Sequence, residues 1–121
     1  NQKGDTMKQM FKLFAVIITL ALSLGVAQAD DGQLKKVEAK YVCMINNKLF
    51  DKAQIPVEVA GKTYYGCCPM CKAKLEKSVQ ARTATDPVSK KTVDKATAVI
   101  GAKADGTVFY FENEKNMKLF R

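Results

Sequence analysis

The stretch Tyr64–Cys71 reads YYGCCPMC and contains three of the four cysteines of the chain. Its aromatic residues favour a β-strand. Pro69 suits the first position of a helix, because its fixed φ angle fits there and its missing N–H would be unpaired anyway. The stretch therefore predicts a strand followed directly by a helix, with the thiols at the junction between them. The fourth cysteine, Cys43, lies upstream, with 23 residues between it and Cys67.

The first 29 of the 121 residues have the pattern of a secretory signal peptide and are left out of the predicted fold. A basic start precedes an apolar run over 13–26, and small residues predict cleavage after Ala29. Residues 1–6 have no role in this pattern. The apolar run is short for a membrane span, which needs about 20 apolar residues. We therefore expect a periplasmic protein with no stable membrane insertion after cleavage, and a retained N-terminal anchor is the alternative.

The chain that would remain, 30–121, has 92 residues with 17 basic and 11 acidic side chains, a net charge of +6. A basic balance can indicate binding to nucleic acid or to an anionic membrane. Here the lysines are scattered singly or in pairs, so a solvated lysine surface is the better interpretation, and no nucleic-acid partner is expected. A chain of 92 residues can bury only a modest hydrophobic core, so a bound metal or a disulfide would add to its stability.

Three segments follow the predicted signal peptide. Residues 30–40 are polar and charged and predict a flexible leader. A first unit, 41–82, begins with a short apolar run over 41–45 that fits a strand or a knuckle. It continues with a predicted hairpin of strands 55–59 and 63–67 joined at 60–62, and ends in a helix from Pro69 to about Arg82.

The second unit, 86–121, has the same order: a strand over 96–102, a turn over 104–106, an aromatic return strand over 107–111 and a helix over 112–120 capped by Asn113. The predicted fold is thus α+β, a hairpin and helix unit repeated twice, whose half-cores bury each other's apolar faces. The overlay of the two units places Cys67 on Phe111, Cys71 on Lys115, Leu75 on Leu119 and Cys43 near Ser89.

Thiolates at a strand-to-helix junction suit Zn(II), Cu(I), Cd(II) or Hg(II). The spacing of Cys67 and Cys71 lets a turn residue and a first-turn helix residue converge, and a helix N-terminus stabilises thiolate. The chain has no histidine, which excludes the commonest mixed zinc sites and the usual Cu(II) ligands. We therefore predict three thiolate ligands: Cys43, Cys67 and Cys71.

Three further sulfur atoms lie close to these ligands in the sequence. Neighbouring side chains diverge on a strand, so two adjacent cysteines rarely bind the same ion. Cys68 is therefore left with three possible roles: a fourth ligand, a spare thiol or a disulfide partner. Met44 and Met70 could supply thioether ligands to Cu(I), although each is also a gap-filling core residue by composition.

Two alternatives to a metal site remain open. Four thiols in a small exported chain also fit two disulfides, with three possible pairings, and would make this a stapled structural or interaction domain. The pattern Cys68-Pro69-Met70-Cys71 opens a helix as redox motifs do. The remaining chain is, however, short for a thioredoxin-like domain, and the absence of histidine removes the usual general base for cysteine catalysis. No enzymatic activity is expected.

A single cysteine, an aromatic strand ending in Cys-x3-Cys and a basic helix together resemble the TRASH domain and the related YHS domain. The residues that carry the resemblance are 42–44 and 61–71, and the second unit is similar to a YHS unit without cysteines. The resemblance implies a small treble-clef-like fold in which Cys43, Cys67 and Cys71 are the metal ligands. It also implies heavy-metal binding, here of Cu(I) or Zn(II), with a metal transporter or metalloprotein acceptor as partner. Met44 stands where some relatives have further ligand cysteines.

Overall fold

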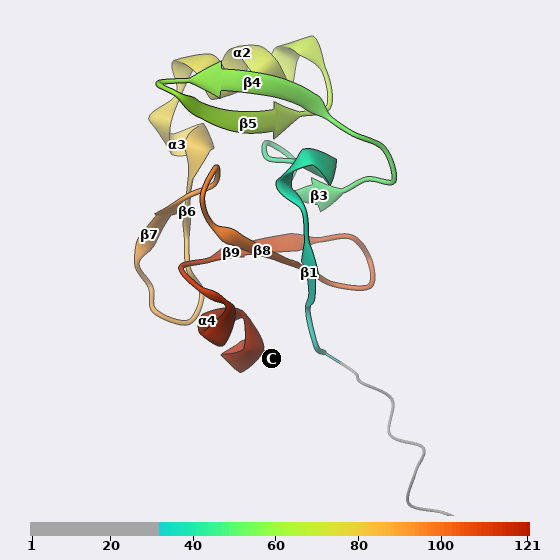
Figure 1. The fold of residues 1–121 in the computed structure, drawn as a ribbon, viewed down its shortest axis with the longest axis vertical. Coiled ribbons are helices and arrows are strands. Elements are labelled where there is room, and N and C mark those ends of the chain that lie inside the picture. The colour runs from blue at the N-terminus through green and yellow to red at the C-terminus, as the bar shows by residue number, and fades with distance from the viewer. Residues whose placement is uncertain (1–31) are drawn as a thin grey trace, which may run out of the picture. The chain divides into compact units, whose positions relative to one another are not determined.

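Each half of the described chain contains two antiparallel strand pairs followed by a helix (Figure 1). The computed structural model describes residues 32–121, which form one compact unit. The predicted signal peptide over 1–29 lies outside the described residues. Of the helices that the structure describes, none has the length and apolar character to cross a membrane. The fold is mixed α+β, as the sequence predicts.

The elements of the first half position three of the four cysteines at their ends. In chain order they are β2 (Val42–Cys43), β3 (Lys48–Leu49), β4 (Ile55–Val59), β5 (Lys62–Gly66) and α2 (Pro69–Lys77). The second half contains β6 (Thr83–Thr85), β7 (Thr92–Asp94), β8 (Val99–Ala102), β9 (Val108–Phe111) and α4 (Glu114–Leu119). The short helix α3 (Val79–Arg82) connects the halves, and β1 (Lys35–Val37) and the 3-10 helix η1 (Ala39–Tyr41) precede them.

The hairpin of β4 and β5 matches the prediction closely. Val59 pairs with Lys62 across a two-residue turn, and both turn residues have positive φ, 51° at Ala60 and 77° at Gly61. Two successive positive φ angles give the tight turn that fits the right-handed twist of a hairpin. Pro56 is accommodated because β4 pairs with a strand on one side only.

The predicted helix from Pro69 to Arg82 is interrupted at Ser78. Helix α2 begins at Pro69 as expected, but Ser78 has extended backbone angles, with φ −117° and ψ 117°. Its hydroxyl accepts a hydrogen bond from the backbone N–H of Ala81 at 3.3 Å and so caps a second helix, α3. Serine competes with the helix backbone through such bonds, and this explains the break.

The predicted flexible leader over 30–40 differs from the structure at its C-terminal end. Residues 35–37 form β1, which pairs antiparallel with β8, and Val37 lies opposite Ile100. Leu34 is buried against Phe111 and Met117. Burial of these apolar side chains offsets the entropy of ordering a charged segment.

In the second half the predicted strand over 96–102 is shorter, beginning at Val99. The backbone N–H groups of Ala96 and Ala98 instead bond to Asp94, and this closes a turn after β7. The predicted cap is confirmed: the Asn113 side chain accepts a hydrogen bond from the N–H of Asn116 at 2.8 Å at the start of α4.

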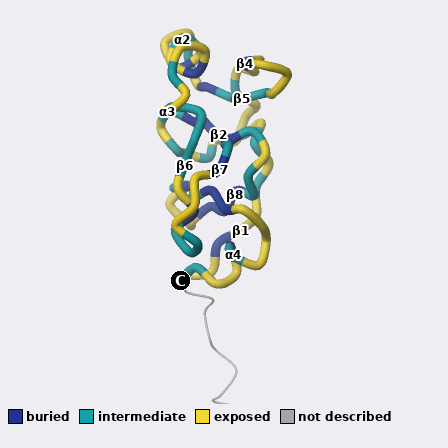
Figure 2. The backbone as a smooth tube through the Cα atoms, turned by 90° about the vertical axis from the view of Figure 1, so that its left-hand side faces the viewer, coloured by how far each residue is buried: buried dark blue, intermediate teal, exposed yellow. Residues whose placement is uncertain are grey.

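The main hydrophobic core combines residues from both halves. Its buried members are Val42, Met44, Val57, Tyr64 and Leu75 from the first half and Val93, Ile100, Ala102, Val108 and Tyr110 from the second. Figure 2 shows the buried positions concentrated along β2 and β8. The two halves therefore bury each other's apolar surface, and the cysteine-bearing turn after β2 is anchored in a core that neither half makes alone.

Candidate metal centre

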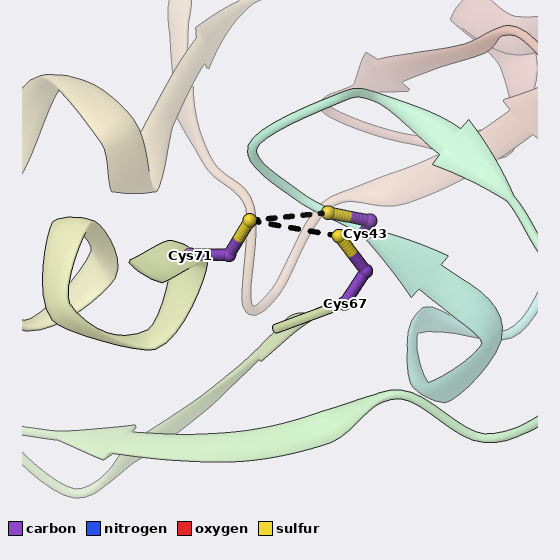
Figure 3. Close-up of side chains that lie close together, drawn as sticks. All are labelled: Cys43, Cys67 and Cys71. Carbon is purple, nitrogen blue, oxygen red and sulfur yellow. Dashed lines mark hydrogen bonds between the residues drawn. The ribbon is translucent and has the colours of Figure 1, made fainter. Parts of the chain in front are cut away.

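Three cysteines from separate elements bring their sulfur atoms together (Figure 3). Cys43 ends β2, Cys67 follows β5, and Cys71 is the third residue of α2. Their three sulfur atoms all lie within 4.8 Å of one another. The structure thus brings together the three residues predicted as ligands.

The separations of these sulfur atoms fit a single metal ion. Sγ of Cys71 lies 3.6 Å from Sγ of Cys67 and 4.0 Å from Sγ of Cys43. Three thiolates bound to one ion at a metal–sulfur distance of about 2.3 Å would be about 3.8 Å apart in a tetrahedral site and about 4.0 Å apart in a trigonal one. Binding an ion would therefore need only small side-chain movements.

The turn between β2 and β3 holds Cys43 in place. The backbone N–H of Met44 donates to the carbonyl of Tyr65 at 2.9 Å, which ties this turn to β5. Cys43 is fully buried. Burial raises the pKa of its thiol, but hydrogen bonds from the backbone of Asn46 and Ile45 and from Cys67 outweigh it, so the pKa is lowered overall. Donors converging on sulfur favour the thiolate that a metal requires.

The thiols of Cys67 and Cys71 both have raised pKa values, for different reasons. Hydrogen bonds with the side chains of Cys43 and Cys71 raise the pKa of Cys67 to about 12. Burial raises the pKa of Cys71, and a hydrogen bond with Cys68 adds to this. Neighbouring thiolates repel one another, and a bound cation would remove that repulsion, so metal binding and thiol deprotonation are coupled.

Cys68 lies beside the three-cysteine cluster but outside it. Its sulfur is 3.4 Å from Sγ of Cys71, although it is not one of the three mutually close sulfur atoms. It is the N-cap residue of α2, and its side chain makes no capping hydrogen bond. A hydrogen bond from the backbone of Cys71 lowers its thiol pKa. All four thiols are free.

The two methionines considered as thioether ligands lie in different environments. Met44 is fully buried and packs in the main core, as a gap-filling residue does. Met70 is 71 % exposed on the first turn of α2. The geometry thus gives Met44 a packing role and leaves the side chain of Met70 exposed to solvent.

Three residues near the cluster were missed in the sequence. Asn46 donates through Nδ2 to the sulfur of Cys67 at 3.5 Å. Gly66 lies so close to α2 that an added Cβ would sit 2.9 Å from Cβ of Cys71. A glycine directly before a ligand cysteine was the available signal for a close backbone approach.

The third missed residue is Lys95, which follows β7. It is only 6 % exposed, and its ammonium donates to the Met44 carbonyl at 2.6 Å and to Oδ1 of Asn47 at 3.3 Å. Burial lowers the pKa of Lys95, and the nearby Cys43 opposes this. A positive charge behind the turn that follows Cys43 favours negative charge on the cluster. Nothing in the sequence pattern distinguishes Lys95 from the surface lysines.

Comparisons with models of protein families, with curated proteins and with solved structures gave no match for this chain. The geometry of the cysteine cluster therefore carries the functional interpretation.

Proposed function

We propose that this protein binds one soft metal ion, Cu(I) or Zn(II), through the thiolates of Cys43, Cys67 and Cys71. The observation that carries the proposal is the convergence of three sulfur atoms from three elements within 4.8 Å. A chain without histidine offers mainly sulfur to a transition metal here, and sulfur ligands select Cu(I) and Zn(II).

The proposed biological role is metal carriage in the periplasm, without catalytic turnover. The signal-peptide pattern of the first 29 residues supports export. The exposure of Cys67 supports exchange of the ion with a partner, since an ion bound there can be reached from solvent. The partner would be a metal transporter or a metalloprotein that accepts the ion.

Metal uptake by the reduced protein tests the proposal. We expect about one equivalent of Cu(I) or Zn(II) in the wild type and loss of uptake in Cys67→Ser and in Cys71→Ser. Mass spectrometry of the native protein gives the stoichiometry, and Val79→Ser, which changes an exposed side chain on α3, is the control. Uptake that is unchanged in both cysteine variants would exclude this site.

A disulfide-stapled domain is the competing function, favoured by the 3.4 Å separation of the Cys68 and Cys71 sulfur atoms. Counting thiols in protein purified without reductant and then stripped of metal separates the two. A metal carrier retains free thiols at the cluster, whereas a stapled domain has none. A thiol oxidoreductase would, in addition, reduce insulin.

We also propose that the two halves are copies of one treble-clef-like unit, related to the TRASH and YHS domains, and that the second copy lacks thiols. The common order of two strand pairs and a helix supports this. So does Asp86, which follows β6 much as Cys43 ends β2. Its Oδ2 accepts hydrogen bonds from the N–H of Glu112 at 2.8 Å and from Nδ2 of Asn116 at 2.9 Å.

In this alignment a hydrogen-bonded carboxylate takes the place of the metal. Glu112 directly follows β9 and Asn116 is the third residue of α4, the positions that Cys67 and Cys71 occupy after β5 and in α2. The register is shifted by one residue from the overlay made on sequence. That overlay paired Leu75, which is fully buried, with Leu119, which is 60 % exposed.

A further inference from the structure

The four cysteines differ in how far they are buried. Cys43 is fully buried and Cys71 is 6 % exposed, whereas Cys68 is half-buried and Cys67 is exposed. An ion held by Cys43, Cys67 and Cys71 can therefore be approached from one side only, the side that carries Cys67 and Cys68. The proposed ligand set leaves the thiol of Cys68 unused.

Cys71 is the common neighbour of two alternative sulfur ligands. Its sulfur lies 3.6 Å from that of Cys67 and 3.4 Å from that of Cys68. An ion bound to Cys71 is thus within reach of either sulfur with little side-chain movement. Cys67 and Cys68 are adjacent in the chain and belong to the short connection between β5 and α2, so both exchange partners are positioned by the same segment.

We propose that Cys68 is a ligand-exchange residue that replaces Cys67 on the ion when the ion enters or leaves the site. The bond from the ion to the Cys68 sulfur forms as the bond to the Cys67 sulfur breaks. The proton of the Cys68 thiol passes to the released Cys67 sulfur, so neither the net charge nor the oxidation state of the ion changes. This inference depends on the proposed metal-binding function.

Solvent and a nearby hydrogen-bond donor can stabilise the released Cys67 sulfur. It is exposed, and Nδ2 of Asn46 lies 3.5 Å from it as a hydrogen-bond donor. The ion is then held by Cys43, Cys68 and Cys71 at the N-terminus of α2, where a soft ligand of the acceptor, a thiolate or a thioether, can bind it. The Cys-x-x-Cys pattern thus serves metal transfer in this scheme rather than redox chemistry.

The test compares the equilibrium affinity with the rate of metal transfer in Cys68→Ser. Separate samples of the reduced protein are loaded anaerobically with Cu(I) and with Zn(II). Bathocuproine disulfonate removes the Cu(I) and 4-(2-pyridylazo)resorcinol the Zn(II), both followed by stopped-flow absorbance. We expect an affinity within about threefold of the wild type and a transfer rate at least about tenfold lower. Serine is a favoured N-cap residue, so the variant should fold.

A second variant tests whether the transfer rate depends on the position of the fourth thiol or only on the number of thiols. Cys68→Ser combined with Val79→Cys keeps four thiols but moves one to an exposed site on α3, and it should transfer the metal as slowly as Cys68→Ser alone. An unchanged rate in Cys68→Ser would overturn the inference and leave the metal site intact. A large loss of affinity would make Cys68 a permanent ligand and also overturn it. If the wild type binds neither metal, the proposed function itself fails.

Discussion

At the scale of single residues, the thiol pKa values of two adjacent cysteines are shifted in opposite directions. Cys67 is hydrogen-bonded to the side chains of two other cysteines, and this raises its pKa to about 12. Cys68 accepts a hydrogen bond from the backbone of Cys71, and this lowers its pKa. Only a thiolate reacts readily with alkylating agents. The less exposed of the two, Cys68, should therefore react faster.

We predict that in the metal-free protein iodoacetamide modifies Cys68 before Cys67 at neutral pH, although Cys67 is the more exposed. The reason is that a lowered pKa increases the thiolate fraction at a given pH, whereas Cys67 stays protonated until the pH approaches about 12. Brief alkylation, trypsin digestion and tandem mass spectrometry of the peptide 63–72 locate the modified sulfur. Faster modification of Cys67 would contradict the assignment, and bound metal should protect Cys67.

At the scale of elements, the site depends on how closely β5 approaches the first turn of α2. Gly66 ends β5, and an added Cβ would lie 2.9 Å from Cβ of Cys71 and 3.4 Å from the backbone N of Lys72. The neighbouring atoms belong to the backbone of α2 and to the side chain of Cys71, a proposed ligand, which cannot yield without moving its sulfur. Gly61, in contrast, has open space around its missing Cβ but a φ of +77°.

This contrast gives a matched pair of glycine variants. We expect Gly66→Ala to lower metal affinity by about tenfold or more, as changes that displace a metal ligand do. Gly61→Ala should cost about 1 kcal/mol of stability through its left-handed backbone and leave the affinity within about twofold of the wild type. Competition with a chelator gives the affinity, and urea unfolding gives the stability. Equal affinities for both variants would mean that the close approach is not needed.

At the scale of the whole molecule, the two halves share one core and are linked by polar groups. The main core takes buried side chains from both halves. Lys95 of the second half donates to the carbonyl of Met44 in the first. Within the second half, Asp86 is fully buried, and its Oδ1 accepts hydrogen bonds from the N–H of Val88 at 2.7 Å and of Ser89 at 3.1 Å. With a shared core, we expect the titration of one buried carboxylate to affect the unfolding of the whole unit.

We predict that Asp86→Asn lowers the free energy of unfolding at neutral pH by about 2–4 kcal/mol, because the new amide would face buried N–H donors. Burial raises the pKa of Asp86, but hydrogen bonds from Asn116, Glu112, Ser89 and Val88 outweigh it and lower the pKa from 3.8 to about 2. The ionised form is therefore favoured by folding. Its contribution is complete above about pH 4 and is lost as the pH falls towards about 2.

Urea unfolding between pH 2 and pH 7 measures this effect. The stability difference between the wild type and Asp86→Asn should be constant above about pH 4 and shrink below it. Comparison with the variant cancels the other carboxylates with lowered pKa values, such as Asp94 and Glu114. A difference that does not depend on pH would show that folding leaves the pKa of Asp86 unchanged.

Much of the first half could be predicted from local sequence. The turn glycine at 61, the paired strands around it and Pro69 at the start of α2 all have short-range physical causes, and the structure agrees with each. The proximity of two cysteines was also predictable, because a turn and the first turn of the following helix bring Cys67 and Cys71 together. Cys68, for which the sequence left a fourth ligand, a spare thiol or a disulfide partner open, lies outside the group of three close sulfur atoms.

The rest was decided by contacts between distant segments. A charged segment, 35–37, becomes a strand because β8 offers it a partner. Lys95 is buried because a carbonyl 51 residues away accepts its hydrogen bond. Asp86 becomes a buried acceptor because α4 folds back onto its turn. Local sequence therefore determined the turns, the helix start and the proximity of Cys67 to Cys71. Only the tertiary structure decided which charged groups are buried, since burial of a charge depends on partners that local patterns do not specify.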